Sequence, residues 1–280
     1  MSEVIKKSRT FSLFSIPISI FAQQEYREFL QTALQGTQGI TVHTVNSEML
    51  VDAYTSKEFA RILASAHACL PDGAGIAYAS LALFGEEAAI YPGVDIVGDV
   101  LEIAQESDLR IAVCGAREKE HDAFRAWVTR RAPRATLLCI DPGIIDERDP
   151  RLPLSCEEQL RAFAPQVVLI ALGQGRGVRQ GKQEYVVQSI ARTLPSARII
   201  LGVGGALDML SGSLPRAPKW LRQRGCEWLY RFVLQPWRWK RIVKAVIFFP
   251  FLVAWQAMRE HTFLRATYRV IQKVFRDFRF

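Results

Sequence analysis

Short apolar runs alternate with helical segments between residues 39 and 201, and this alternation limits the fold more than any other feature. The runs with the composition of buried strands are 39–44, 68–70, 110–114, 135–140, 166–172 and 197–201. Between them, apolar residues recur at helical spacing, as at Phe59, Ile62 and Leu63. Strands separated by helices of about 10–15 residues are typical of βαβ units. The sequence therefore predicts an α/β fold, with a Rossmann-like, mostly parallel sheet flanked by helices.

The N-terminal segment is predicted to begin this domain. Residues 11–20 are rich in β-compatible side chains, and Pro17 favours an edge position for the expected strand. A signal peptide is the alternative, because Lys6 and Lys7 precede the apolar residues. Pro17 and the polar residues 23–25 favour a first strand and helix instead.

Charge is distributed unevenly along the chain. From Arg216 to the end there are 15 Lys/Arg and 3 Asp/Glu, a net charge of +12, whereas residues 1–215 hold 21 and 25, a net charge of −4. We therefore predict an α/β domain over residues 1–212 and a basic, aromatic, helical appendage over residues 213–280. Basic tails bind phosphate, either in nucleic acid or in anionic lipid headgroups.

The apolar residues of the appendage favour a membrane surface over nucleic acid. The run 245–258 contains Pro250 and covers only 14 residues, whereas a membrane-spanning helix needs roughly 20. Residues 263–278 interleave apolar and basic side chains in the pattern of a helix that lies in a membrane interface. Nucleic-acid-binding proteins rarely expose a run such as 246–252. We predict an anionic membrane surface as a partner, and no nucleic acid.

Polar residues follow two of the predicted strands. Thr44 and Asn46 end one strand, and Asp72 and Gly73 end the next. If the strands are parallel neighbours, these residues gather at the carboxyl edge of the sheet, where open α/β sheets bind ligands. Asp72 is either the N-cap of the following helix or a general base. Thr44 and Asn46 are either turn residues or hydrogen-bonding groups that position a ligand.

Common metal and cofactor motifs are absent from the sequence. The five cysteines are scattered without metal-ligand spacing, which predicts reduced thiols in a cytoplasm. No D-x-D pair occurs, and the four histidines lack H-x-x-x-H spacing. The glycine-rich segments 173–177 and 202–205 match neither G-x-G-x-x-G nor a P-loop. We predict no metal and no cofactor, so that a departing phosphate group would depend on arginines and helix N-termini.

Several motifs resemble those of the WecG/TagA/CpsF glycosyltransferases in order and spacing. They are T-x-N at 44–46, P-D-G at 71–73, G-x-D at 93–95, G-K-Q-E at 181–184, G-V-G-G-x-x-D at 202–208 and Gly212. The basic segment 216–241 follows the same family pattern, with R-A-P-K-W, G-C-E-W-L-Y-R and P-x-R-x-x-R in that order. The resemblance covers about residues 10–245.

The resemblance implies a bacterial, inverting, metal-independent glycosyltransferase that takes its sugar from a UDP-sugar. The implied acceptor is a polyprenyl-diphosphate-linked sugar at the cytoplasmic face of the inner membrane, in surface-polysaccharide synthesis. Thr44 and Asp72 correspond to the family's catalytic residues, and the C-terminal segment corresponds to one that closes over the active site. The implied substrate-binding residues are Asn46, Gly73, Gly93, Asp95, Gln183, Glu184, Gly204, Asp208, Arg216, Arg231, Arg238 and Arg241.

Two features depart from the family pattern. The loop 174–181 is lengthened and gains Arg176 and Arg179, with Gly181 where proline is usual, so the role of Gln183 stays open. This loop supports an alternative hypothesis, a catalytically silent, membrane-adhering binding or scaffold protein of the same fold. Residues beyond about 258 are expected to form an additional membrane-contacting helix. The sequence does not specify the donor sugar, the acceptor saccharide or whether the chain forms a homo-oligomer.

Overall fold

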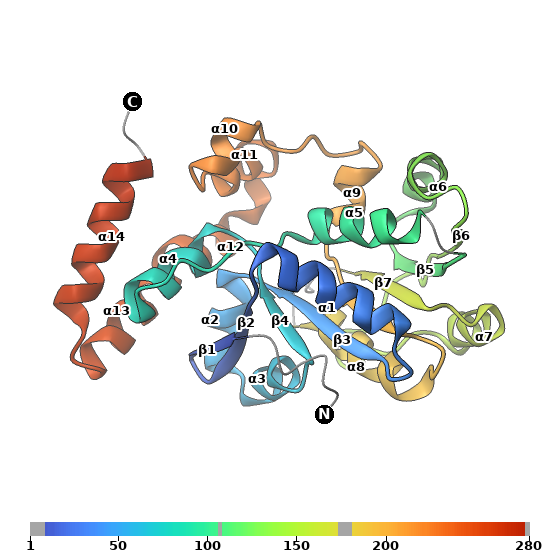
Figure 1. Cartoon of the computed structure of the whole chain (residues 1–280), viewed down its shortest axis with the longest axis horizontal. Coiled ribbons are helices and arrows are strands. Elements are labelled where there is room, and N and C mark those ends of the chain that lie inside the picture. Colours follow the sequence, from blue (N-terminus) through green and yellow to red (C-terminus); the bar gives the residue numbers. More distant parts are fainter. Residues whose placement is uncertain (1–8, 106–107, 173–180, 278–280) are drawn as a thin grey trace.

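A six-stranded parallel sheet forms the centre of the computed structural model, which describes residues 9–105, 108–172 and 181–277 (Figure 1). Across the sheet the strands are β4 (Ala68–Pro71), β3 (Ile40–Val45), β8 (Ile199–Gly202), β7 (Val167–Ala171), β5 (Arg110–Gly115) and β6 (Thr136–Ile140). Each apolar run predicted as a strand from residue 39 onward forms one of them. The predicted α/β fold class is therefore confirmed.

Helices cover both faces of this sheet. One face packs against α1 (Gln23–Gln35), α5 (Gly93–Ala104), α6 (Glu118–Arg131) and α9 (Ala206–Leu210). The other face packs against α2 (Ser47–Thr55), α3 (Lys57–Ala64), α7 (Leu154–Phe163) and α8 (Lys182–Thr193). Within β7, Val167 and Leu169 join the first core, whereas Val168 and Ile170 join the second. Burial on both faces explains why the strands are continuous apolar runs in the sequence.

Residues 9–20 form an antiparallel hairpin, so the prediction of a single strand there is wrong. β1 (Arg9–Leu13) and β2 (Ile16–Ile20) are joined by Phe14 and Ser15, whose φ angles are 52° and 69°. A two-residue turn with both φ angles positive matches the twist of a hairpin, and Asn or Gly usually supplies it. The Phe-Ser pair therefore gave no turn signal in the sequence.

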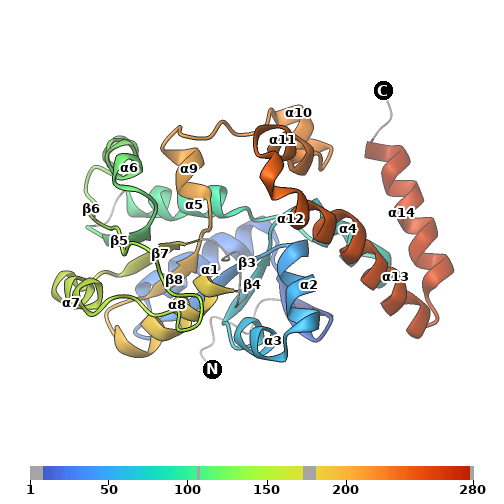
Figure 2. The same ribbon diagram turned by 180° about the vertical axis from the view of Figure 1, so that it is seen from behind.

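The C-terminal appendage is a series of helices that lie outside the sheet and contact α2 and α4 (Figure 2). Its helices are α10 (Lys219–Gln223), α11 (Glu227–Leu234), α12 (Trp239–Val243), α13 (Phe249–Arg259) and α14 (Phe263–Asp277). α13 packs on α2 and on α4 (Ala74–Phe84), and α14 packs on α4 and α13. α4 thus connects the sheet to the two last helices.

Residues 236–259 form one continuous helix of 24 residues. This helix is longer than the apolar run 245–258, from which its length was judged in the sequence. A π-helical turn, Lys244–Phe248, precedes Pro250, and in it the Phe249 N–H donates to the Lys244 carbonyl. Proline has no N–H to donate, and a wide π turn lets the helix continue past it. In the described part of the chain, this helix alone has the length and apolar composition to cross a membrane, and only 11% of its most apolar stretch is buried.

Phe249 attaches this helix to the body of the protein. Its ring is 2% exposed and meets Phe14 edge-on, with centroids 6.0 Å apart. The Phe249→Ala variant should lose roughly 3–5 kcal/mol of unfolding free energy, because it leaves a cavity in the core. Denaturant titration measures this loss. Phe251→Ala is the matched control, since Phe251 is 63% exposed. Equal losses in the two variants would contradict the role of Phe249 in attaching the helix.

Candidate active site

The pairing of β3 with β4 brings Thr44, Asn46 and Asp72 together at the carboxyl edge of the sheet. Thr44 lies opposite Leu70 in the parallel register. Immediately after the strands, the Asp72 N–H donates to the Val45 carbonyl over 2.7 Å. Residues 26 to 28 positions apart in the sequence therefore meet at one point, as expected of parallel neighbours.

Asp72 does not cap the following helix. The N-cap of α4 is Gly73, whose φ of 101° suits glycine rather than a residue with a Cβ. Burial raises the pKa of the Asp72 carboxyl to about 7, although the positive charge of Arg231 partly opposes the shift. The negative charge of Glu227 adds to the increase. A carboxyl group with a pKa near neutrality is suited to exchange a proton.

Thr44 and Asn46 both make hydrogen bonds within the protein. The Thr44 hydroxyl is buried and donates to the Gly202 carbonyl at the end of β8, over 3.1 Å. Asn46 is the N-cap of α2, where its Oδ1 accepts from the Met49 N–H over 3.0 Å. Asn46 thus has the local turn role left open by its sequence, while also lining the cavities described below.

The start of α8 adds a buried amide and carboxyl pair. The Gln183 Oε1 accepts from the Gly204 N–H over 2.8 Å, and its Nε2 donates to Glu184 over 3.0 Å. A Cβ at Gly202 would lie 2.6 Å from that Nε2, so any side chain there would displace the Gln183 amide. Burial raises the pKa of Glu184 to about 7, and its Oε2 has no hydrogen-bond partner among the described residues.

Asp208 completes this side of the site from α9. Burial is the largest cause of its raised pKa, the negative charge of Glu120 adds to it, and the positive charge of Arg117 opposes it. Gly93 begins α5, and a Cβ there would lie 3.1 Å from the Val203 carbonyl. Both residues line the same small cavity as Thr44 and Gln183.

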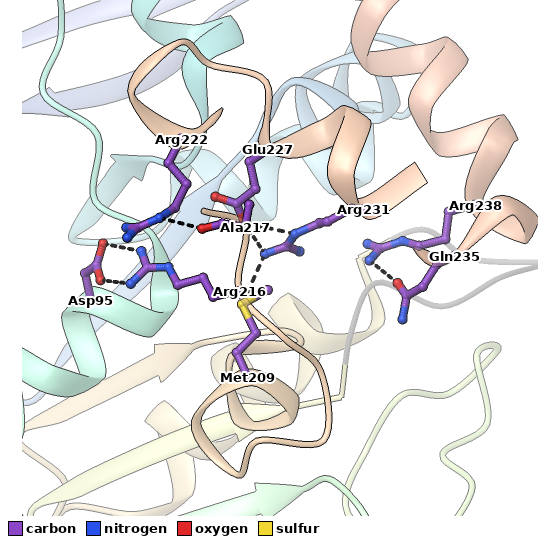
Figure 3. Close-up of polar contacts among 9 residues, drawn as sticks. All are labelled: Asp95, Met209, Arg216, Ala217, Arg222, Glu227, Arg231, Gln235 and Arg238. Carbon is purple, nitrogen blue, oxygen red and sulfur yellow. Dashed lines mark hydrogen bonds and ion pairs between the residues drawn. The ribbon is translucent and has the colours of Figure 1, made fainter. Parts of the chain in front are cut away.

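The appendage brings four arginines over this edge, and Figure 3 shows three of them with their partners. Arg216 forms a two-point ion pair with Asp95, at 2.6 and 2.7 Å. Arg231 pairs with Glu227, at 2.8 and 3.0 Å. Each guanidinium is thus held in place, so the positive groups are positioned before any ligand arrives.

The other two arginines lie on the following helix. Arg238 donates to the amide oxygen of Gln235 over 2.8 Å. Burial, together with the charges of Arg241 and Arg231, lowers the Arg238 pKa to about 10. Arg241 pairs with Glu48 at 2.6 Å. Arg241 and Arg231 thus place positive charge close to the buried Arg238 guanidinium, and such a cluster favours an anion.

Two cavities meet beneath these arginines. The smaller has a volume of about 120 Å³ and is lined by Thr44, Gln183, Gly204 and Asp208, whereas the larger has about 880 Å³ and continues between α4, α13 and α14. The residues that line both are Asn46, Asp72, Pro92, Arg216, Glu227, Arg231, Arg238 and Arg241. Asp72 and the arginines therefore lie at the junction of a small polar space and a large one.

All the site residues expected from the sequence line one or both of these cavities. Those that line only one are Gly73 and Asp95 in the larger cavity, and Thr44, Gly93, Gln183, Glu184, Gly204 and Asp208 in the smaller. The added Arg176 and Arg179 lie outside the described residues, so the effect of the lengthened loop stays a prediction. Among the described residues, no three His, Cys, Asp or Glu side chains are grouped to hold a metal ion.

Two of the carboxylates that hold the arginines, Glu227 and Glu48, were not identified from the sequence, whereas Asp95 was. Glu227 pairs with Arg231 at helical i, i+4 spacing, and Glu48 lies in the first turn of α2, two residues after the N-cap Asn46. The spacing of Glu227 was a usable signal. Glu48 had none, because its partner lies 193 positions away.

Comparison with known proteins identifies the family. The profile described as "Glycosyl transferase WecG/TagA/CpsF family" matches residues 11–262. The chain belongs to this family. The expected resemblance and the assignment to a family of hexosyltransferases are therefore confirmed. The match ends before α14, which begins at Phe263.

Relatives in this family share about a quarter of their residues with the chain. A Bacillus subtilis (strain 168) protein is 27% identical over 205 residues, which are 73% of this chain and 75% of the relative. A Staphylococcus aureus (strain MRSA252) protein is 26% identical over 224 residues, 79% of this chain and 82% of the relative. Both relatives are named N-acetylglucosaminyldiphosphoundecaprenol N-acetyl-beta-D-mannosaminyltransferase.

The raised pKa of Asp72 predicts a pH-dependent stability difference. Between the ordinary pKa of 3.8 and about 7, the folded state retains a proton that the unfolded chain releases, so wild-type stability falls as pH rises. Asp72→Asn removes this dependence. As pH rises toward 7, we expect the stability of the variant relative to wild type to increase by up to about 1 kcal/mol per pH unit. Above pH 7 the difference should stay constant. Denaturant titrations between pH 5 and 8 measure the difference, and a constant difference would contradict the raised pKa.

Proposed function

We propose that this protein transfers a sugar, with inversion, from a UDP-sugar to a saccharide carried on polyprenyl diphosphate. The observation that carries the proposal is the position of Asp72 at the junction of two cavities under an arginine cluster. The names of the relatives support an acceptor of this class, since they describe an undecaprenyl-diphosphate-linked sugar as acceptor.

In this proposal the smaller cavity holds the transferred sugar of the donor. Thr44, Gln183 and Asp208 line it, and they offer a hydroxyl, an amide and a carboxylate to sugar hydroxyl groups. The bond from Gln183 to the Gly204 N–H fixes the amide, so the site is ordered before the sugar binds. Such preorganisation lowers the entropy cost of binding. The donor sugar itself is left to experiment.

Asp72 is the proposed general base. Its carboxylate takes the proton of the acceptor hydroxyl as that oxygen bonds to the anomeric carbon. The bond from this carbon to the diphosphate breaks on the opposite face, its electrons remain on the departing UDP, and the configuration inverts. With a pKa of about 7, Asp72 is partly ionised near neutral pH and retains the basicity to accept the proton.

The arginines are proposed to stabilise the negative charge that develops on UDP. Arg231 and Arg238 line both cavities, and a guanidinium binds phosphate oxygens at two points. Positioned charges that meet developing negative charge contribute strongly to catalysis. The division into residues 1–212, which carry the reacting groups, and residues 213–280, which cover them and bind the membrane, belongs to the same proposal.

A scaffold protein without chemistry is the second candidate. The lengthened loop 174–181 supports it. Incubation with polyprenyl-diphosphate-linked N-acetylglucosamine and a panel of UDP-sugars separates the two candidates, because a scaffold releases no UDP. If no donor in the panel leads to release of UDP, the proposed enzymatic activity is overturned.

The general base is tested by Asp72→Asn. We expect the catalytic constant to fall by about 10²–10⁴-fold while the dissociation constant of the donor stays within about twofold. In wild type, kcat/KM should rise with pH through about 7 as the carboxyl loses its proton. Release of UDP measures the rate, and titration calorimetry measures donor binding.

Asp99→Asn is the matched control for that experiment. Asp99 has a raised pKa, caused mainly by burial, and it lies on α5 outside both cavities. Its loss should leave the pH profile in place. If Asp72→Asn keeps the catalytic rate of wild type and the same rise of kcat/KM with pH, another group is the base.

We also propose that the appendage binds the cytoplasmic face of the inner membrane. In the described chain, most of the exposed large apolar side chains belong to it, among them Ile247, Phe251 and Leu264, which are 61%, 63% and 83% exposed. Such patches mark membrane or protein contacts. Each nearby basic residue adds about 1 kcal/mol of attraction to an anionic leaflet.

Replacement of apolar side chains on this surface by charged ones should release the protein from membranes. The double variant Phe251→Asp, Leu264→Asp should lower partition into vesicles of anionic phospholipid at least tenfold, because buried apolar side chains contribute about 1.5–3 kcal/mol each. Vesicle sedimentation measures this. Ile144→Asp is the control, since Ile144 is fully exposed on the body, and equal losses would contradict the assigned surface.

A further inference from the structure

The larger cavity extends well beyond the reacting groups. From Asp72 and the arginines it continues between α4, α13 and α14, and its volume is about seven times that of the smaller cavity. Most side chains along this extension are apolar, among them Ala79 and Ala82 of α4 and Val253 of α13. Neither a sugar nor a nucleotide has an apolar part that would need such a space.

Small residues keep this extension open. Ala79 and Ala82 on α4, Ala254 and Ala257 on α13, and Ala266 on α14 all line it. Alanine side chains at facing helix positions leave space that leucine or phenylalanine would fill. Figures 1 and 2 both show α14 beside α13, with α4 close to the pair. The three helices therefore enclose an apolar channel, the alanine channel, which these five residues line.

We propose that the alanine channel binds the hydrocarbon chain of the acceptor lipid. The inference rests on the proposed function and deepens it by assigning the acceptor its own binding site. The lipid diphosphate would lie near Arg216 and Arg241, its sugar would reach Asp72, and its polyprenyl chain would pass between α4, α13 and α14.

The charge pattern of the cavity supports this occupant. Cationic side chains line the end near Asp72, and apolar side chains line the other end. A polyprenyl-diphosphate-linked sugar has the same order of properties: a polar sugar, an anionic diphosphate and then a hydrocarbon chain. Apolar contacts would bind the hydrocarbon chain, and the arginines would fix the position of the diphosphate and thereby of the chain along the channel.

The outer surfaces of the same helices connect the channel to a bilayer. On α13, Val253 and Ala257 are buried toward the channel, whereas Phe251 and Trp255 are 63% and 46% exposed. A lipid chain could thus pass between two helices whose outer faces are apolar. Because the family match ends at residue 262, α14 supplies a wall of this channel that lies outside the shared family region.

α14 is held in place by polar contacts with the body. The Tyr78 hydroxyl donates to Asp277 over 3.0 Å, and Lys273 pairs with Glu87 at 2.6 Å. The Arg269 guanidinium also donates to the Ala82 carbonyl over 3.1 Å. These bonds fix α14 against α4 without filling the space between them.

Photocrosslinking tests the channel without requiring catalysis. The probe is a long-chain polyprenyl diphosphate with a photoreactive group on the hydrocarbon, added to the full-length protein in detergent. Mass spectrometry should locate crosslinks on the alanine channel, at α4 and at the inner faces of α13 and α14. Crosslinks confined to outward side chains such as Phe251 and Trp255 would overturn the proposal.

Val270→Trp is expected to obstruct the channel. Val270 lines it, whereas Val274, one turn further along α14, is 41% exposed and lies outside it. The tryptophan at 270 should lower channel crosslinking at least fivefold, and Val274→Trp, the matched control, should change it less than twofold. Ala254→Phe obstructs the channel from α13 and serves if Val270→Trp fails to fold. Equal crosslinking in wild type and both channel variants would overturn the proposal.

Transfer assays separate the failure of this inference from the failure of the proposed function. With an active donor, Val270→Trp should raise the ratio of KM for a long-chain acceptor to KM for a short geranyl-diphosphate-linked acceptor at least tenfold. An unchanged ratio would refute the channel while the glycosyltransferase activity stands. Absence of transfer with every donor would refute the proposed function, and crosslinking would still report on the channel.

Discussion

The parallel pairing of β3 with β4 on one side and β8 on the other is the constraint on which the site depends. This register brings the ends of three strands to one edge, so that Thr44 reaches Gly202 and Asp72 reaches Val45 through hydrogen bonds. A shift by one residue would turn each side chain to the opposite face of the sheet. The apolar residues on both faces therefore fix the polar residues at the edge.

Electrostatics at this edge follows from burial on one side and from cations on the other. Asp72 and Glu184 each acquire a pKa of about 7 because desolvation disfavours their charged forms. Arg238 shows the complementary effect, with a pKa lowered to about 10. Neither sign is fully neutralised in the free protein, so the cleft is prepared both for a proton transfer and for an anion.

The sequence predicted the sheet better than it predicted the tail and the turns. Strands buried on both faces give strong apolar runs, and their polar ends identified Thr44 and Asp72. The hairpin at Phe14 and Ser15 was missed because neither residue type signals a positive φ. Helix 236–259 was underestimated, because a π turn before Pro250 cannot be read from composition. Contacts between distant positions, such as Glu48 with Arg241, require the fold itself.

In the proposed function, the ion pairs of the appendage would let a charged cover stay docked and still respond to a ligand. Arg216 with Asp95 and Arg241 with Glu48 join the appendage to the body, and both arginines remain partly exposed. The Arg216–Asp95 pair is the more exposed of the two, and exposed pairs contribute about 0–1 kcal/mol. A diphosphate offers a guanidinium more charge and a similar two-point geometry. In the proposed function, exchange of carboxylate for phosphate would therefore cost little, and the carboxylates that hold the arginines in the free protein would also set the affinity that an incoming anion must exceed.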